Sequence, residues 1–479
     1  MNSSILILLG ATGDLAQYKI IPAVYELGRR HLLPSHFSLL GNGRTSLSDA
    51  DFRDYLHSQL TAKFGPKLHQ PTLNRLLSHT HYIQGSLDDN TTYQKLQLKL
   101  DAINTHGPRC DNRIFHLAIL PDLYPIVVAK LGKFGFNQNR CGWTHILLEK
   151  PFGTNLQTAR SLDRTLLKYF HEQQIFRIDH YLAKETVQNL LSFRFANEMF
   201  EPLWNRDYID HIQITMTETT GIKNRSAFYE RTGALKDVVQ NHAMQLLAMT
   251  MMDQPFTLDA AGIRESRRRL LESLVTPYTS TIKRYVVRGQ YRGYRQEPGV
   301  DPHSHTETFV ALKAEVNHPR WTGVPAYIRA GKKLCRDITD IAVIFKDKKL
   351  APSPNVINLQ IAPKESIILR FFVKKPGPNH DLQPANLKFD YQELKGDPLE
   401  AYQRVLIDAF AGNLTLFTLA SDVEAEWRFI DPIQKYWHRE SAPLPTYPNN
   451  CWGPKAAAAM IQQDGRDWLP PSTDLAFSN

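Results

Sequence analysis

The chain has 479 residues, enough for two or three domains, and its 42% hydrophobic content is ordinary for a globular protein. The formal net charge is +9 at pH 7, and the basic residues are spread along the chain in short clusters such as Arg267–Arg269. This distribution argues against a nucleic-acid-binding arm and against a polybasic membrane segment. It suits an enzyme that attracts phosphorylated ligands.

Targeting and redox signals are weak in the sequence. The N-terminal apolar run Ile5–Leu9 is too short for a signal peptide, and no apolar stretch is long enough to span a membrane. We therefore expect a cytoplasmic protein without a membrane partner. The cysteines lie far apart without a C-x-x-C pair, which predicts neither a disulfide framework nor a zinc site. They are Cys110, Cys141, Cys335 and Cys451.

The first predicted unit is a strand, a glycine turn and a helix, as at the start of a dinucleotide-binding fold. Ile5–Leu9 is wholly apolar, like a buried parallel strand. Apolar residues in Leu15–Arg30 have the spacing of a helix, which Pro22 must kink or begin anew. The turn has the order G-x-x-G-x-x-A, which permits backbone N–H groups to approach a pyrophosphate. A plain strand-to-helix turn is the alternative. The predicted cofactor-binding residues here are Gly10, Ala11, Thr12, Gly13, Asp14 and Leu15.

The second predicted strand, Phe37–Leu40, bears on which cofactor is bound. Sites for NAD place an Asp or Glu at the end of this strand to bind the ribose 2′-hydroxyl. Here no carboxylate follows the strand, and Arg44 lies within reach. This favours a 2′-phosphate and hence NADP, although NAD is not excluded as a second cofactor. The alternative is that Arg44 is a solvated loop residue.

Three further buried strands, at 81–83, 114–118 and 145–148, alternate with helical stretches and predict a parallel sheet covered by helices. The last of them leads into a Glu-Lys-Pro turn, where Pro151 removes a backbone donor and can form a cis peptide bond. Lys150 in this turn would lie over the carboxyl edge of the sheet, close to both cofactor and substrate.

The next predicted strand leads into residues 177–185, where an acid, an imidazole, a phenol and an amine lie within a few residues, and a helix follows. Open α/β sheets bind ligands where strands end and helices begin. His180, Tyr181 and Lys184 are donors that can converge on one anion, with help from the helix dipole. The carboxylate of Asp179 can orient a histidine or hold an ion pair. An exposed, charged helix start explains the same stretch equally well.

The pattern then changes. Residues 209–217 alternate as a strand that ends at Glu218, and a long helix runs from 233 to 252. His242 lies in the apolar stripe of this helix, so that spacing alone favours a buried core histidine. Asp237 stands five residues earlier, about 140° round an α-helix of ~3.6 residues per turn. The two side chains therefore share no face, although both can border one cleft.

From residue 306 onward strands dominate. The predicted strand at 357–361 alternates strictly between apolar and polar residues, which indicates an antiparallel sheet with one solvent-exposed face. His303 and His305 have no acid or third ligand at a matching spacing, so we predict no metal site there. Late helices are predicted at 400–410 and 423–430. The predicted strands are 308–316, 324–329, 341–345, 357–361, 367–373 and 387–391.

The expected architecture is therefore α/β followed by α+β. Residues 1–178 form a Rossmann-type dinucleotide-binding domain, and residues 179–479 form a larger domain for substrate binding and dimerisation, with a mainly antiparallel sheet.

Five motifs, in order and over essentially the whole chain, resemble those of the glucose-6-phosphate dehydrogenase family. They are the glycine turn at 10–16, Glu149–Gly153, Arg177–Glu185, Asp237–His242 and Val324–Leu334. The C-terminal stretch from Tyr447 to Pro454 is also similar to the end of that family. One motif departs slightly, because Ala183 stands where glycine is usual.

The resemblance implies oxidation of β-D-glucose 6-phosphate at C1 to 6-phospho-D-glucono-1,5-lactone with NADP, the first step of the oxidative pentose phosphate pathway. It implies that His242 is the general base for the C1 hydroxyl proton, which replaces the interpretation as a core histidine. Asp179 would orient His242 and stabilise its imidazolium form. No metal is implied, because the cofactor takes the electrons.

The resemblance also implies the binding residues and the assembly. Those for the sugar phosphate are His180, Tyr181 and Lys184, and those for the sugar hydroxyls are Glu218, Asp237 and Lys332. Lys150 would touch both substrate and cofactor, and Lys19 and Arg44 match basic residues on the cofactor side. The family forms dimers, or tetramers built from dimers, through the large sheet of the second domain, so we expect a homodimer or homotetramer.

One position departs from the family in a way that concerns the phosphate. A basic residue usually stands five positions after the lysine matched by Lys332, but Asp337 stands there and Arg336 precedes it. We expect that the turn is shifted by one residue and that Arg336 substitutes. The other possibilities are that His180, Tyr181 and Lys184 hold the phosphate alone, or that the substrate is not phosphorylated.

Two rival interpretations fit the sequence less well than this family. Related sugar oxidoreductases also carry a Glu-Lys-Pro turn after a nucleotide-binding domain, but they lack the Arg-Ile-Asp-His-Tyr segment. A catalytically silent relative that binds a sugar and a dinucleotide would be expected to have lost His242 or Asp179, and both are present.

Overall fold

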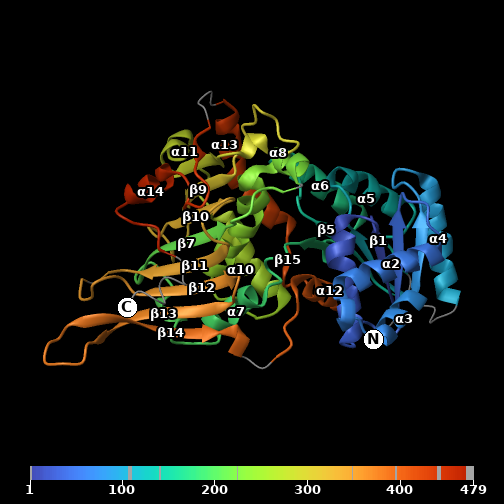
Figure 1. The fold of residues 1–479 in the computed structure, drawn as a ribbon, viewed down its shortest axis with the longest axis horizontal. Coiled ribbons are helices and arrows are strands. Elements are labelled where there is room, and N and C mark those ends of the chain that lie inside the picture. The colour runs from blue at the N-terminus through green and yellow to red at the C-terminus, as the bar shows by residue number, and fades with distance from the viewer. Residues whose placement is uncertain are drawn as a thin grey trace.

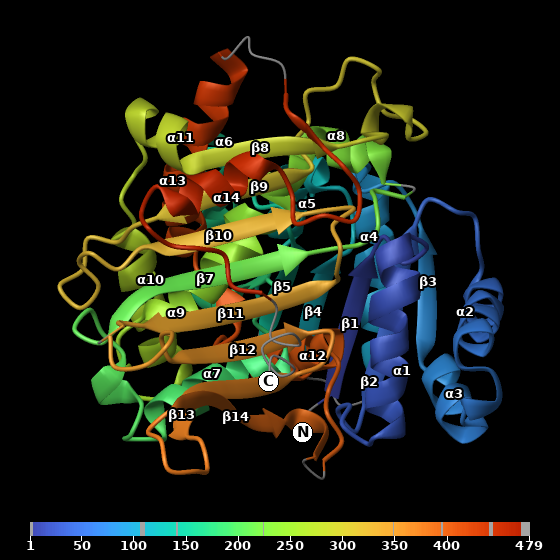
Figure 2. The same ribbon diagram turned by 60° about the vertical axis from the view of Figure 1, so that its left-hand side comes forward.

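The computed structural model describes residues 3–105, 111–139, 142–223, 225–347, 349–393, 396–439 and 444–470. Two β-sheets stand side by side with helices packed around and between them, as Figures 1 and 2 show. The first sheet belongs to the N-terminal part of the chain, and the second, larger sheet belongs to the C-terminal part.

The first sheet has the strand order of a doubly wound dinucleotide-binding fold, β3-β2-β1-β4-β5-β6, with all six strands parallel. Its strands are β1 (Ser3–Leu9), β2 (Phe37–Gly43), β3 (Thr80–Gln84), β4 (Asp111–Leu117), β5 (Thr144–Glu149) and β6 (Ile175–Ile178). The helices of this part are α1 (Ile21–Arg29), α2 (Asp49–Phe64), α3 (Gln70–Ser78), α4 (Asn90–Thr105), α5 (Tyr124–Lys133) and α6 (Leu156–Tyr169). The predicted Rossmann-type fold is confirmed.

The first helix is divided where proline predicts a break. A π-helical segment, Ala16–Ile20, leads directly into α1, and Pro22 occupies the first turn of α1. Because proline has no backbone N–H, it cannot bond back to the preceding turn, and the irregular π-helical segment lies at that turn. Pro22 therefore starts a new α-helical segment.

The second sheet has nine strands in the order β14-β13-β12-β11-β7-β10-β9-β8-β16. Neighbouring strands are antiparallel except in the pairs β7–β10 and β8–β16, so the prediction of a mainly antiparallel sheet is confirmed. The strands are β7 (Ile209–Thr217), β8 (Val286–Tyr291), β9 (Phe309–Ala314), β10 (Ala326–Gly331), β11 (Ile338–Phe345), β12 (Val356–Ala362), β13 (Ser366–Lys374), β14 (Leu382–Asp390) and β16 (Thr446–Tyr447).

Two details of the second sheet differ from the prediction. The strand expected at 387–391 begins at Leu382 and includes Pro384, which an edge strand accommodates. The polar face of β12 is not wet, because Asn358 and Gln360 are only 1% and 4% exposed. On β7, which β11 separates from β12, the C-terminal segment covers the sheet. Nε2 of Gln213 donates to the backbone oxygen of Asp467, and its Oε1 accepts from the backbone N–H of Leu469.

Helices occupy the space between the two sheets, most visibly α7, α9 and α10 behind the large sheet in Figure 2. The segment that crosses this space is a π-helix, Leu235–Ala243, continued by α9 (Met244–Met251). The other helices of this part are α7 (Glu185–Phe195), α8 (Ser226–Ala234), α10 (Ala260–Glu272), α11 (Thr279–Tyr285), α12 (Ala401–Ala411), α13 (Ala420–Arg439) and α14 (Lys455–Gln462).

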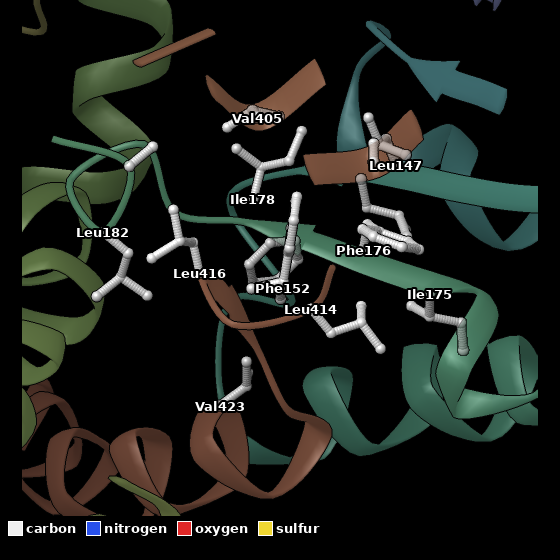
Figure 3. Close-up of a cluster of buried hydrophobic side chains, with 14 of the residues drawn as sticks. Leu147, Phe152, Ile175, Phe176, Ile178, Leu182, Val405, Leu414, Leu416 and Val423 are labelled. Carbon is white, nitrogen blue, oxygen red and sulfur yellow. The ribbon is translucent and has the colours of Figure 1, made fainter. Parts of the chain in front are cut away.

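The C-terminal part of the chain also completes the first sheet. The short strand β15 (Phe417–Thr418) pairs antiparallel with β6, and α12 packs against α1. Figure 3 shows the apolar cluster at this junction, where Leu414, Leu416 and Val423 lie against side chains of β6 such as Phe176. The two parts thus share one continuous core, and the boundary at residue 178 stays a prediction.

Cysteine and membrane expectations are tested only within the described ranges. Cys335 and Cys451 are free thiols, whereas Cys110 and Cys141 lie outside the described residues. Among the helices that the structure describes, none combines the length and the hydrophobicity needed to cross a bilayer.

Candidate active site

The turn after β1 packs tightly against the segment that follows β4. Gly10 has a φ of +87°, and a Cβ there would lie 2.3 Å from the carbonyl oxygen of Ala118. Only glycine therefore fits this position. The backbone N–H groups of Gly10 and Ala11 donate to the carbonyl oxygen of Asn42 at 3.0 and 2.8 Å, which fixes the turn against β2.

The second strand of the sheet ends beside this turn. Leu9 pairs with Asn42, so that Arg44 follows two residues beyond that pair at the same edge of the sheet. Gly43 faces Thr12, because a Cβ at Gly43 would lie 3.1 Å from the Thr12 hydroxyl oxygen. Arg44 is exposed, and no carboxylate ends β2. Lys19, on the helix that follows the turn, is exposed as well.

The closest acid–base pair in the site joins two distant motifs. Nδ1 of His242 lies 2.6 Å from Oδ1 of Asp179, and both side chains are almost completely buried. Asp179 follows β6, and His242 comes from the π-helix, so the carboxyl edge of the first sheet meets the inter-sheet helix here. The backbone N–H of Tyr181 donates to the same Oδ1 at 2.9 Å, which fixes the carboxylate.

Burial and electrostatic interactions have opposite effects on the pKa values of this pair. Burial lowers the pKa of the His242 imidazole below its ordinary value, although the Asp179 carboxylate acts to raise it. Burial acts to raise the pKa of Asp179, but the hydrogen bond from His242 and the charge of Lys150 oppose burial and hold that pKa below its usual range. The pair is therefore a carboxylate next to an imidazole that is neutral at physiological pH.

Three donors surround His242 on the side of the following helix. The His180 and Tyr181 rings have their centroids 4.7 and 4.2 Å from that of His242, and Nζ of Lys184 lies 4.1 Å above the Tyr181 ring. Burial lowers the pKa of Lys184 and raises that of Tyr181 to about 12, so the phenol stays a donor at neutral pH. The structure thus brings together the donors that the sequence predicted.

A second cation reaches the site from the Glu-Lys-Pro turn. Nζ of Lys150 donates to the backbone oxygen of Asp237 at 2.6 Å and lies 3.4 Å from its Oδ1. The Lys150–Pro151 peptide bond is cis. The charges of Lys150 and Arg225 hold the pKa of the Asp237 carboxyl below its usual value, against the effect of burial.

The helix geometry corrects one expectation. Asp237 and His242 were placed about 140° apart on an α-helix, but residues 235–243 form a π-helix. A π-helix bonds residue i to i+5, which brings residues five apart onto nearly the same face. Asp237 and His242 therefore face the same site, and each influences the pKa of the other.

The large sheet contributes the remaining predicted residues. Nζ of Lys332, just after β10, lies 2.7 Å from Oε2 of Glu218, just after β7. The parallel pairing of β10 with β7 places these strand ends together. The Glu218 and Asp237 carboxylates both act on the Tyr181 phenol, which connects this ion pair to the rest of the site.

Asp337 has a structural partner, which explains why a carboxylate is tolerated there. Its Oδ1 accepts from the backbone N–H of Thr219 at 2.7 Å and its Oδ2 accepts from the Thr219 hydroxyl at 2.8 Å. The neighbouring Arg336 is exposed, and its backbone oxygen accepts from the Thr217 hydroxyl at 2.8 Å. Asp337 thus fixes the loop that carries Glu218.

Contacts of Tyr402 and His116 near the donors were not predicted from the sequence. Tyr402 on α12 lies parallel to His180 with ring centroids 6.5 Å apart, and it bonds Glu149. Nε2 of His116 lies 3.2 Å from Oε1 of Glu149. Glu149 belongs to the Glu-Lys-Pro motif, whereas no sequence pattern around Tyr402 indicated that α12 reaches the carboxyl edge of the first sheet.

The same cluster contains three potential metal ligands. Ligand atoms of Asp179, His180 and His242 all lie within 4.8 Å of one another. Nδ1 of His242 and Oδ1 of Asp179 already satisfy each other, and Lys150 adds positive charge beside them. This arrangement suits proton transfer better than cation binding.

Two family models together match nearly the whole chain. Residues 7–189 match "Glucose-6-phosphate dehydrogenase, NAD binding domain", and residues 191–469 match "Glucose-6-phosphate dehydrogenase, C-terminal domain". The chain belongs to the glucose-6-phosphate dehydrogenase family. In this family member the site takes Asp179 and Lys150 from the first matched region and His242 and Lys332 from the second, so neither region forms it alone.

Curated and solved relatives agree over the same length. The glucose-6-phosphate 1-dehydrogenase of Aggregatibacter actinomycetemcomitans is 38% identical, with 98% of this chain and 97% of that protein covered. A crystal structure of glucose-6-phosphate 1-dehydrogenase from Mycobacterium avium is 31% identical with a TM-score of 0.85, covering 98% of this chain and 99% of that chain. A glucose-6-phosphate dehydrogenase in complex with its substrate glucose-6-phosphate is 28% identical with a TM-score of 0.91 and the same coverage.

Proposed function

We propose that this protein is a glucose-6-phosphate 1-dehydrogenase that oxidises β-D-glucose 6-phosphate at C1 to the 6-phospho-lactone, the first step of the oxidative pentose phosphate pathway. The observation that carries the proposal is the buried pair of His242 and Asp179, with 2.6 Å between Nδ1 and Oδ1. Membership of the glucose-6-phosphate dehydrogenase family supplies the substrate class.

In this proposal His242 is the general base. Asp179 binds Nδ1, so the other ring nitrogen, Nε2, is left to accept the proton of the C1 hydroxyl. Asp179 fixes the ring and stabilises the imidazolium that forms. The lowered pKa of His242 keeps it neutral, and hence able to accept a proton, at physiological pH.

The phosphate and the sugar are held by different sets of residues. We assign His180, Tyr181 and Lys184 to the phosphate, because they are clustered donors beside the base. We assign Glu218, Asp237 and Lys332 to the sugar hydroxyls, with Lys150 between sugar and cofactor.

Arg336 completes the phosphate site in this proposal. Asp337 is held by Thr219, which supports the idea that the carboxylate does not meet the phosphate and that the preceding Arg336 takes that part. Arginine suits the task, since its guanidinium forms charge-assisted bonds to phosphate.

NADP is the proposed cofactor, and when bound its nicotinamide accepts the hydride from C1. The residues that would hold it are Gly10, Ala11, Thr12, Gly13, Asp14, Leu15, Lys19, Arg44 and Lys150. Arg44 at the end of β2 supports NADP over NAD, because it can pair with the 2′-phosphate. NAD remains a usable second cofactor, because it shares every group of NADP except the 2′-phosphate that Arg44 would bind.

The proposal extends to assembly and location. We expect a homodimer, or a tetramer of dimers, formed through the large sheet. Leu382, Leu387 and Phe389 of the edge strand β14 are 37%, 61% and 38% exposed, which supports that surface. We expect the cytoplasm as the location and neither nucleic acid nor membrane as a partner.

The direct test is the appearance of reduced nicotinamide absorbance when the protein is mixed with glucose 6-phosphate and either NADP or NAD. We expect reduction with both and a higher kcat/KM with NADP. No reduction with either cofactor would favour a catalytically silent relative. Activity should persist in the presence of a metal chelator, because the chemistry assigned to His242 and Asp179 needs no metal.

A further inference from the structure

A buried carboxyl group on α13 contacts the helix of the proposed base, and the reaction described above gives it no role. Glu426 is 2% exposed. Its Oε2 accepts from Nε2 of Gln240 at 3.1 Å, and its Oε1 accepts from Nε2 of Gln245 at 2.6 Å. Gln240 and Gln245 lie on either side of His242 on one continuous helical segment. One carboxyl group therefore ties α13 to this segment at two points that flank His242.

The charges around Glu426 are mostly negative. Asp422 comes from its own helix, Asp179 from the end of β6, and Arg267 from α10. Arg267 is already paired with Asp422, with 3.1 Å between its NH2 group and Oδ2. The hydrogen-bonded partners that the described residues offer Glu426 are both neutral amides. A charged carboxylate at this position would have no counter-ion of its own.

Burial and these neighbours favour the protonated form. Burial raises the pKa of Glu426 well above its ordinary value, Asp422 and Asp179 raise it further, and Gln245 and Arg267 only partly oppose them. The amide of Gln245 is compatible with a protonated acid. Its Oε1 is buried and has no hydrogen-bond partner among the described residues, so an amide turned over by 180° would accept the O–H of Glu426 where Nε2 now lies.

The His242–Asp179 pair needs support from this side. Oδ2 of Asp179 is buried and has no hydrogen-bond partner among the described residues, so the carboxylate is held through Oδ1 alone. The position of His242 relative to Asp179 therefore depends on how its helix is held. Proton transfer is sensitive to displacements of about 1 Å, which can lower a rate by roughly 10²-fold.

We propose that Glu426 is a positioning residue for the reaction: an uncharged carboxyl group that holds the helix of His242 in register with Asp179. An ionised Glu426 would place a second buried negative charge near Asp179 and would disfavour this packing. The inference rests on the proposed function for its kinetic test and is independent of it for its test of charge.

The test of charge compares wild type with Glu426→Gln, which keeps the shape and removes the ionisation. The unfolded chain releases the Glu426 proton near its ordinary pKa of about 4.3, whereas the folded chain keeps it. As pH rises above that value, the folded-to-unfolded ratio of wild type should fall relative to that of Glu426→Gln, by about tenfold per pH unit. Urea unfolding between pH 5 and 8 measures the ratio.

A matched control lies on the same helix. Glu424 is at the surface, where Arg160 and Arg428 hold its pKa below the ordinary value. Glu424→Gln should therefore show a constant difference from wild type over the same pH range. A constant difference for Glu426→Gln as well would mean that Glu426 is charged in the folded protein, and would overturn the proposal.

The kinetic test uses Glu426→Ala, which leaves both glutamine amides without a partner. We expect kcat to fall about tenfold or more, with KM values for glucose 6-phosphate and NADP within about twofold of wild type. Glu426→Gln should restore kcat near pH 7 and should keep activity to higher pH than wild type. If Glu426→Ala folds poorly, Glu426→Asp, which is too short to meet both amides, should give the same loss.

Two kinetic results would contradict the positioning role. One is a kcat for Glu426→Ala equal to that of Glu424→Gln, and the other is an identical alkaline decline in wild type and Glu426→Gln. A wild-type protein that does not oxidise glucose 6-phosphate would instead refute the proposed function, and the unfolding experiment would still report the charge of Glu426.

Discussion

At the scale of single residues, the His242–Asp179 pair carries the proposed chemistry. His242→Asn should keep the fold and substrate affinity, because asparagine can still bond Asp179 but cannot accept a proton. General-base catalysis typically contributes ~10²–10⁴-fold, so kcat should fall by at least that factor with little change in KM. Steady-state kinetics with glucose 6-phosphate and NADP measure both constants.

A second histidine offers a matched control for this variant. His211 is also buried, and its Nδ1 lies 2.6 Å from Oδ2 of Asp210, but this pair is in the large sheet away from the site. His211→Asn should leave kcat within a few-fold of wild type. If His242→Asn loses less than tenfold in kcat while its KM rises strongly, His242 is a substrate ligand and not the base.

The phosphate assignment makes Arg336 a further test. A charge-assisted bond to phosphate contributes ~1.5–3 kcal/mol, and 1.4 kcal/mol corresponds to tenfold in affinity. Arg336→Ala should raise KM for glucose 6-phosphate roughly tenfold or more and leave activity on concentrated glucose almost unchanged. Arg206→Ala provides a control, because the Arg206 side chain is 51% exposed and its Nε is as far as 4.0 Å from Oδ1 of Asp207. An unchanged KM for the phosphorylated sugar would exclude Arg336.

Cofactor choice rests on Arg44. Arg44→Ala should raise KM for NADP by about tenfold, because a charge-assisted bond to the 2′-phosphate is lost, and should change KM for NAD much less. Initial rates with each cofactor at saturating glucose 6-phosphate provide the comparison. Equal effects on the two cofactors would remove Arg44 from this role.

At the scale of elements, the short strand β15 supports the strand that leads to Asp179. Phe417 is 1% exposed and packs edge-on against Phe176 of β6, with ring centroids 4.7 Å apart. Phe417→Ala should lower the free energy of unfolding by ~3–5 kcal/mol, since a large buried ring is lost. It should also lower kcat, because β6 carries Asp179 at its end.

Urea unfolding of Phe417→Ala can be compared with that of a variant at an exposed phenylalanine. Phe256 is fully exposed, and Phe256→Ala should leave both stability and kcat near wild type. If the two variants are equally stable, β15 is a marginal addition to the first sheet and does not support the site.

Local patterns could predict most elements of the fold. Wholly apolar runs such as Ile5–Leu9 and alternating runs such as 209–217 fell on β1 and β7. The alternation did not reveal that β7 is buried on both faces, because the C-terminal segment covers its polar side chains. The strand β15 could not be predicted, because two residues carry no periodicity and its pairing with β6 is decided by tertiary packing.

Helix type and distant contacts were hidden for similar reasons. The π-helix at 235–243 differs from an α-helix by one residue per hydrogen-bonded loop, which an apolar stripe does not reveal. Motifs in the sequence identified most residues of the site. The contact of Tyr402 with His180 could not be predicted, because it joins segments more than 200 residues apart. The partner of Asp337, Thr219, was equally invisible before the strands were paired.

At the scale of the whole molecule, the assembly is predicted to use the large sheet. Sedimentation should give about twice the 54.9 kDa mass of one chain, or four times that mass. Leu387→Glu, on the exposed edge strand, should shift the protein toward the monomer by placing a charge in an apolar contact. Leu120→Glu, at a 72% exposed position of the N-terminal part, should not change the mass. A dimer unaffected by Leu387→Glu would place the interface elsewhere.

The central claim is that hydride passes from C1 of glucose 6-phosphate to the cofactor. Incubation with NADP and glucose 6-phosphate that carries deuterium at C1 tests the claim directly, with mass spectrometry of both products. We predict one deuterium in each reduced cofactor and an unlabelled 6-phospho-lactone or its hydrolysis product. Reduced cofactor without deuterium, or no reduction at all, would contradict the account.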